Sequence, residues 1–200
     1  MSALINIFIL LFVLTQAIYV MFGLIKPSLW RLGVLVQPVA VLLLLGALGE
    51  GHMVAFSNLH LALFMHIAGS LLAHGLLAYA AFAAVAVWVK EAELKNKNIN
   101  LLGRVLPPLA DSEKALFMAL ILALSQLVLA IVAGHIYEYQ TSGVVAYANL
   151  KTFTSYGTLA FGAGILWMHK TSGTRGRKAA QYTLVTYLLL LLAYLVQRIF

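Results

Sequence analysis

The chain of 200 residues contains no cysteine. It therefore has no internal disulfide, no thiolate metal site, no iron–sulfur cluster and no thiol to which haem could be attached. The HExxH, GxSxG and phosphate-binding glycine motifs are absent as well. Each of these motifs places catalytic groups at a defined spacing, so their absence leaves no recognisable enzyme signature. No catalytic residue is assigned from the sequence.

Charge is also scarce. Charged residues make up 10% of the chain and hydrophobic residues 63%, with a mean hydropathy of +0.97. Soluble domains are nearer to 45–50% apolar and about 25% charged, so the lipid bilayer is the expected surroundings of this chain. None of the acidic residues is predicted to lie in mid-membrane, so a carboxylate relay for ion transport has no obvious members. The acidic residues are Glu50, Glu91, Glu93, Asp111, Glu113 and Glu138.

Six continuous apolar segments predict an all-α, polytopic membrane helix bundle with about six transmembrane helices. A helix of ~20 residues crosses the ~30 Å hydrocarbon core, and strands of a barrel would alternate instead. Connections are short, so residues 1–200 form a single integral membrane domain. Asp111, just after Pro107 and Pro108, is expected to cap the fourth helix. The segments are about 3–25, 32–49, 61–89, 115–137, 152–168 and 180–197.

The basic residues predict the orientation of the chain. Eleven of the 13 lysines and arginines fall in the connections after the first, third and fifth segments. Only Lys151 and Arg198 fall on the other side. The positive-inside rule therefore places both termini outside and the three basic connections in the cytoplasm. This asymmetry explains the net charge of +7 without nucleic acid as a partner.

Histidines gather in the outer half of this topology. The third segment carries His66 near the outer interface and His74 about 12 Å deeper at helical rise. Counting ~20 residues outward from Lys114 places His135 near the outer interface as well. The third and fourth helices run antiparallel, so His66 and His135 are expected at the same depth. His52 and His60 lie in the outer connection before the third helix.

Two interpretations of these histidines stay open at this point. Neutral imidazoles from two helices at one level can ligate haem or a borderline metal ion, with His66 and His135 as the first pair. Alternatively, interfacial histidines reach water or bond to a neighbouring carbonyl. The deeper His74 fits a packing role better than a ligand role, and His169 fits a solvated inner interface. His60 and His52 are the reserve candidates.

From His66 onward the chain resembles the cytochrome c assembly protein family, whose members include CcsA, ResC and HemX. The resemblance is closest to the shorter YpjD-like inner-membrane branch. No single motif decides it, but the stretches follow one another at family-like separations over about residues 60–200. They are HIAGSLLAHGLLAYAAFAAVAVWVKEAEL (66–94), RVLPPLADSEKALF (104–117), Gly134, Lys151-Thr152, GTRGRKAAQYTL (173–184) and LLLLAYL (189–195).

The resemblance implies haem handling at the outer face of a bacterial cytoplasmic (inner) membrane, with His66 at the position of a family haem ligand. Two family features are missing. Residues 138–157 contain no tryptophan, so the WWD signature of the haem-attaching members is absent, and no second histidine follows near the C-terminus. His135 takes that place spatially in our interpretation. The resemblance thus favours an accessory or regulatory role beside other cytochrome-assembly or membrane proteins.

Two other functions compete with this one. A haem-b electron-transfer subunit would need ligands on both sides of the bilayer, whereas these histidines gather outside. A transporter or regulator could retain the fold without haem, since function does not follow from fold.

Overall fold

The computed structural model describes residues 4–48, 53–55, 60–97, 101–143 and 150–199. Within these ranges almost every residue is helical, and two short strands, β1 (Leu4–Asn6) and β2 (Met53–Ala55), pair antiparallel with Leu4 opposite Ala55. The helices are α1 (Ile7–Ile25), the 3-10 helix η1 (Pro27–Leu32), α2 (Gly33–Leu48), α3 (Leu61–Asn96), α4 (Leu101–Val105), α5 (Leu109–Ser142), α6 (Leu150–Ser172) and α7 (Gly176–Ile199).

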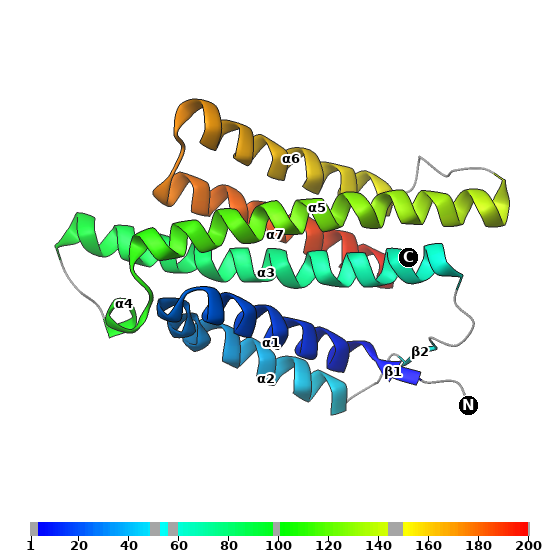
Figure 1. The fold of residues 1–200 in the computed structure, drawn as a ribbon, viewed down its shortest axis with the longest axis horizontal. Helices are drawn as coiled ribbons and strands as arrows, with labels where there is room; N and C mark the ends of the chain where they lie inside the picture. Colours follow the sequence, from blue (N-terminus) through cyan, green and yellow to red (C-terminus); the bar gives the residue numbers. More distant parts are fainter. Residues whose placement is uncertain (1–3, 49–52, 56–59, 98–100, 144–149, 200) are drawn as a thin grey trace.

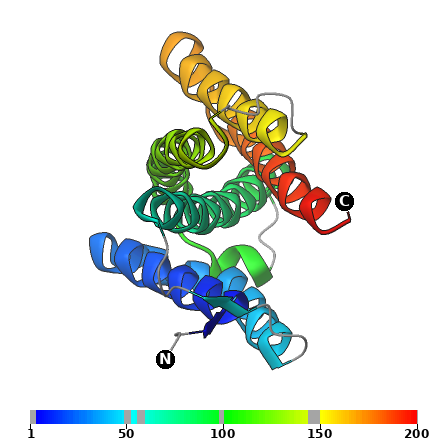
Figure 2. The ribbon, with the colours of Figure 1, turned by 90° about the vertical axis from the view of Figure 1, so that its right-hand side faces the viewer.

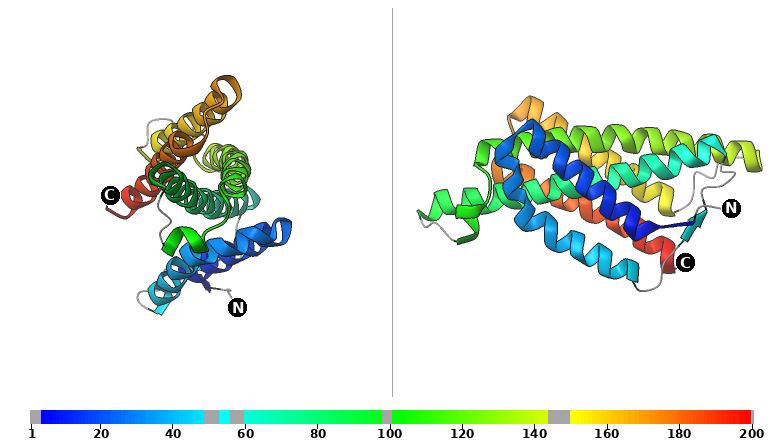
Figure 3. Two further views of the ribbon diagram at one scale, coloured as in Figure 1. Left: turned by 90° about the vertical axis from the view of Figure 1, so that its left-hand side faces the viewer. Right: turned by 60° about the horizontal axis from the view of Figure 1, so that its bottom comes forward.

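Helices α3 and α5 form the centre of the bundle. The α1–α2 hairpin lies along one side of this pair and the α6–α7 hairpin along the other (Figure 1). Figure 2 looks along the bundle from the end where α3 begins and α5 ends, here called the histidine end. The opposite end, where α3 ends and α5 begins, is called the basic end (Figure 3, left). Helices α1 and α3 begin at the histidine end, and α7 finishes there.

Small side chains allow the two central helices to approach each other closely. A Cβ built on Gly69 of α3 would lie 3.3 Å from the Cβ of Ala130 in α5. Without a strong hydrophobic drive between helices in lipid, such close packing is what holds them together. Alanines are buried along the remaining length of both helices, namely Ala73, Ala80, Ala83, Ala84, Ala119 and Ala123.

Aromatic and apolar side chains attach the α1–α2 hairpin to this centre. Phe22 of α1 stacks on Tyr79 of α3 with ring centroids 4.3 Å apart, and both side chains are fully buried. The opposite sides of α1 and α2 expose large apolar residues such as Leu24 and Leu42. An apolar outer surface on an apolar core is the arrangement that a bilayer requires.

Four helical stretches among the described residues are long and apolar enough to cross a membrane. They are Phe8–Ile25, Pro27–Leu48, Leu61–Asn96 and Leu109–Ser142. The protein is therefore an all-α polytopic membrane helix bundle. Helices α6 and α7, with 23 and 24 residues, run alongside these four but do not belong to that set. A total of six crossings stays a prediction.

The expected capping role of Asp111 is wrong. Helix α5 begins at Leu109, because Pro108 takes the N-cap position with an extended backbone (φ −55°, ψ 147°) and makes no side-chain cap. Asp111 therefore lies inside the first turn. Its carboxylate accepts a hydrogen bond of 2.6 Å from Ser28 Oγ and lies 3.5 Å from Lys26 Nζ. The acid thus ties η1 to α5 rather than capping its own helix.

Single-cysteine variants test the topology directly, because the natural chain has no thiol. With six crossings, we expect a membrane-impermeant maleimide to label Gln140→Cys in intact cells but not Lys95→Cys or Ser172→Cys. All three positions are exposed in the structure. With only four crossings, Ser172 would lie outside and its variant would be labelled like Gln140→Cys. Labelling of Lys95→Cys in intact cells would contradict the orientation itself.

Candidate functional site

Three of the predicted site histidines lie at the histidine end. His60 directly precedes α3, His66 lies in its second turn, and His135 lies two turns before the end of α5. His66 is at the level of Gly134, the residue before His135, so the two histidines share a depth as predicted. His52 lies outside the described residues.

The imidazole of His66 is seated on the backbone of α5. Its Nδ1 lies 2.7 Å from the carbonyl oxygen of Ala130. A carbonyl only accepts hydrogen bonds, so Nδ1 carries the proton and Nε2 keeps its lone pair. Gly134 makes room for the ring, because a Cβ at that position would lie 2.8 Å from Nδ1. Gly134 and His66 both belong to the stretches that carry the family resemblance, and the glycine makes the space that the histidine ring occupies. We call the Gly134 space and the Ala130 carbonyl together the seat of His66.

This arrangement is suited to ligation of a metal centre. Ligating histidines usually donate their other ring nitrogen to a carbonyl or carboxylate, which fixes the ring and raises the basicity of the ligating atom. His66 meets that condition through Ala130. Among the residues that the structure describes, no group of three His, Asp or Glu side chains is placed to hold a free metal ion. A haem would need only one or two side-chain ligands from the protein, because its porphyrin would supply the others, and His66 is of the residue type that would hold it.

His135 faces a different neighbour from His66. Its Nε2 lies 2.7 Å from the hydroxyl of Tyr156 in α6, and its Nδ1 lies 3.4 Å from a carboxylate oxygen of Glu138. The carboxylate accepts a hydrogen bond from Nδ1–H, so the Tyr156 hydroxyl donates to Nε2. Successive helical residues differ by ~100° in direction. His135 therefore turns toward α6 while Gly134 faces α3. The structure brings the two histidines to one level but does not pair them.

The remaining candidates have distinct surroundings. The exposed His60 ring lies 6.3 Å from the ring of Tyr137, centroid to centroid, beside the two histidines already described. His74 lies inside the bundle, where its Nδ1 is 3.2 Å from the Ser70 carbonyl and its ring is close to the backbone of Leu190 in α7. Its position is that of a packing histidine between α3 and α7.

His169 lies at the basic end and holds the turn between α6 and α7. Its Nδ1 lies 2.9 Å from the Thr174 carbonyl, and its ring stacks on Phe117 of α5 with centroids 3.7 Å apart. Sequence reasoning expected a solvated interface here. The stacked ring is instead part of the contact between α5 and the α6–α7 hairpin.

A carboxylate clamp at the basic end was missed by sequence reasoning. The backbone N–H of Gly176 donates to Glu113 of α5 over 2.6 Å, and the N–H of Arg177 donates to Glu91 of α3. Both N–H groups belong to the first turn of α7, where helical N–H groups lack partners within the helix. Gly176 has φ +59°, and a Cβ there would clash with the Glu91 carboxylate. The tract GTRGRKAA, whose basic residues contribute to the predicted orientation, therefore also docks α7.

The model of the cytochrome c assembly protein family matches residues 1–200. The chain belongs to this family. It is also 36% identical over 130 residues to an "uncharacterized 28.8 kDa protein in nifR3-like 5′ region" of Azospirillum brasilense. That match covers 65% of this chain and 48% of the relative, so the chain spans about half the length of the curated relative that it matches. No solved structure matches the chain.

Membership confirms the predicted family, whereas the YpjD-like branch stays a prediction. It also supports the broader expectation of a membrane protein of haem handling and cytochrome c biogenesis. Two of the stretches that carried the resemblance now have physical roles. Gly134 seats His66, and the glycine of GTRGRKAA at position 176 lets α7 dock on the clamp.

The seat of His66 predicts the effect of a methyl group at position 134. We expect Gly134→Ala to lower the melting temperature in detergent, because the new Cβ would displace the ring from Ala130; overpacking of this kind typically costs about 1–3 kcal/mol. Gly164→Ala is the matched control, since a Cβ there meets nothing within 4 Å. The control should be neutral or slightly stabilising. Equal melting temperatures for Gly134→Ala and the parent would contradict the seat.

Proposed function

We propose that the chain is an accessory or regulatory haem-handling protein of cytochrome c assembly, with His66 as an axial haem ligand at the outer face of a bacterial cytoplasmic membrane. The observation that carries the proposal is the tethered imidazole, with Nδ1 2.7 Å from the Ala130 carbonyl and Nε2 left to ligate. Family membership supports the same role. The predicted topology, with the histidine end outside, supplies the side of the membrane.

Each residue of the site has a defined task in this proposal. Haem, when bound, supplies an iron that accepts an imidazole nitrogen. The Ala130 carbonyl holds the Nδ1 proton of His66, so the lone pair stays on Nε2. Gly134 leaves space for the ring, and Gly69 keeps α3 close enough to α5 for the tether to form. The helices, rather than a loop, thus set the direction of the ligand.

His135 is the proposed second ligand, and it has to exchange partners to serve. Its Nε2 is engaged by the Tyr156 hydroxyl at 2.7 Å. Ligation therefore requires the phenol to release the nitrogen and the ring to turn from α6 toward α3. His60, which lies beside Tyr137, is the reserve ligand at the same end. His52 remains a further reserve from the sequence alone.

The placement of the histidines favours assembly over electron transfer across the bilayer. A haem-b subunit that moves electrons across a membrane needs ligands toward both faces. At the basic end, the His169 ring is stacked on Phe117, and its Nδ1–H donates a hydrogen bond to the Thr174 carbonyl oxygen. That histidine serves the turn between α6 and α7. The histidine end is thus the better supported place for haem.

Removal of the imidazole of His66 should abolish haem retention. We expect His66→Ala, purified from haem-replete cells, to show a Soret absorbance per protein at least about tenfold below that of the parent, because the bond from His66 to the iron is lost. His169→Ala is the control at the basic end and should retain haem. Thermal unfolding of both variants separates loss of a ligand from loss of the fold. A His66→Ala protein with a parental spectrum at equal yield would show that His66 is not the ligand.

The accessory role predicts that this chain does not attach haem to apocytochrome alone. Residues 138–157 offer tyrosines and Phe153 but no tryptophan to support a haem ring, and no cysteine is present for thiol exchange. We expect no covalent haem when the chain is the only assembly factor in cells that lack their own. Haem staining of c-type cytochromes measures this. Mature cytochrome in those cells would overturn the accessory role.

A further inference from the structure

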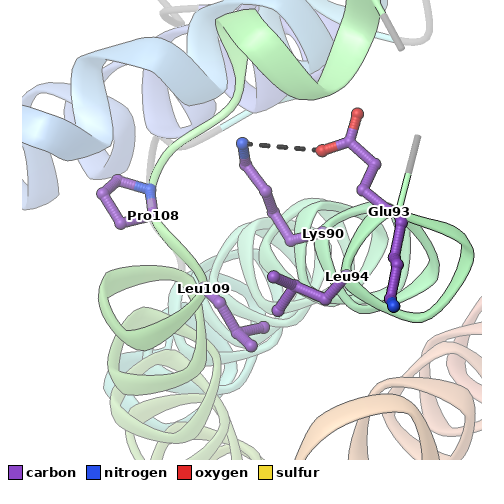
Figure 4. A pocket seen from close by; sticks show the side chains of 6 residues that line it. Lys90, Glu93, Leu94, Pro108 and Leu109 are labelled. Carbon is purple, nitrogen blue, oxygen red and sulfur yellow. Dashed lines mark ion pairs between the residues drawn. The ribbon is translucent and has the colours of Figure 1, made fainter. Parts of the chain in front are cut away.

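A cavity of about 480 Å³ lies at the basic end, away from the histidines. The last turns of α3 and the beginning of α5 line it, and it is open to the outside (Figure 4). Its walls combine cationic and apolar side chains with one carboxylate. The lining residues are Lys90, Glu93, Leu94, Lys97, Pro108 and Leu109. None of them belongs to the proposed haem site, so this cavity calls for its own explanation.

The connections at this end carry more positive than negative charge, with eleven lysines and arginines against four acidic residues. Each of the four acidic residues at this end holds a group of the protein: Glu91 holds the N–H of Arg177, Glu113 that of Gly176, Asp111 holds Ser28 and Lys26, and Glu93 pairs with Lys90. Lys97 is exposed and has no ion pair among the residues that the structure describes. An occupant of the cavity should therefore be an anion.

Two lysines present their charge to this space in different ways. Lys90 is fixed, because its ammonium donates to the Gly103 carbonyl of α4 and lies 3.8 Å from Glu93. Figure 4 shows Lys90 and Glu93 facing each other across from Pro108. Lys97 follows the last turn of α3 in a left-handed conformation (φ 50°), which ends the helix at the rim of the cavity. The Lys90–Glu93 pair is neutral in sum, so Lys97 supplies the net charge.

The apolar walls restrict the occupant further. Leu94 is 68% exposed and Leu101 of the adjacent α4 is 81% exposed. Exposed leucines beside lysines do not suit a fully hydrated ion. At the boundary between lipid headgroups and acyl chains, the headgroup suits the lysines and the acyl chains suit the leucines. The depth of the cavity in the membrane agrees with such an occupant. Trp88 is 38% exposed, and tryptophan is enriched at membrane interfaces. Lys90 lies ~3 Å beyond Trp88 along the helix axis.

We propose that this cavity binds the phosphate of an anionic phospholipid of the inner leaflet. Lys97 and the free side of Lys90 contact the phosphate, and Leu94 and Leu109 contact the glycerol and upper acyl region. Juxtamembrane lysines are attracted to anionic lipid surfaces, by about a factor of five in affinity for each charge. The inference is independent of the proposed haem function and stands or falls without it.

Native mass spectrometry of the detergent-purified full chain, titrated with phosphatidylglycerol or phosphatidylcholine, tests the proposal. We expect phosphatidylglycerol to bind at least about fivefold more tightly than phosphatidylcholine. Lys97→Asn should lower that affinity about fivefold, because one positive charge is lost. Asparagine is the chosen replacement because it tolerates the left-handed backbone conformation. Lys95→Gln is the matched control: it removes an equal charge from the same end, at a residue that does not line the cavity. It should change the affinity less than twofold.

Three results would overturn the proposal. The first is equal affinity for the two lipids. The second is an equal effect of Lys97→Asn and Lys95→Gln, which would indicate a diffuse charge effect rather than a site. The third is displacement of the lipid by millimolar glycerol phosphate, which would show that the cavity takes soluble phosphates. Haem spectra of the same variants should match the parent, so failure here leaves the haem proposal untouched.

Discussion

The close contact between α3 and α5 is the constraint on which the rest of the structure depends. In a bilayer, apolar helices gain little by leaving lipid for one another, so side-chain size decides which pairs associate. Gly69 meets Ala130 at a Cβ distance of 3.3 Å, and buried alanines continue the contact along both helices. A larger residue at one of these contact positions would push α3 and α5 apart. These two helices bear the residues described at both the histidine end and the basic end.

The register of α3 against α5 sets the side-chain arrangement at both ends of the bundle. At the histidine end it places His66 over Gly134, within reach of the Ala130 carbonyl. At the basic end it brings Glu91 and Glu113 from separate helices to the first turn of α7. A slip of one residue would turn each of these side chains by ~100° and lose both arrangements. The proposed ligand and the docking of the last helix therefore share one physical cause.

The sequence predicted the helices and the depth of the histidines, but not where the side chains point. Apolar length and the 3.6-residue period determine how far His66 and His135 lie along the bundle. Whether His135 faces α3 or Tyr156 of α6 depends on how three helices pack, and no local pattern records that. The Glu113–Gly176 contact spans 63 positions and was missed for the same reason. Asp111 was misplaced because the helix begins three residues earlier than expected.

Disulfide trapping tests the register of α3 against α5 most directly, since the chain has no cysteine of its own. The Cβ distance between positions 69 and 130 is 3.3 Å, near the ~3.5–4.5 Å that disulfides span. The account predicts rapid oxidation of a Gly69→Cys/Ala130→Cys variant in membranes and little for Gly69→Cys/Val132→Cys, since Val132 faces outward with 51% exposure. Equal oxidation of the two pairs, or preference for the second, would contradict the register and with it the seat of His66.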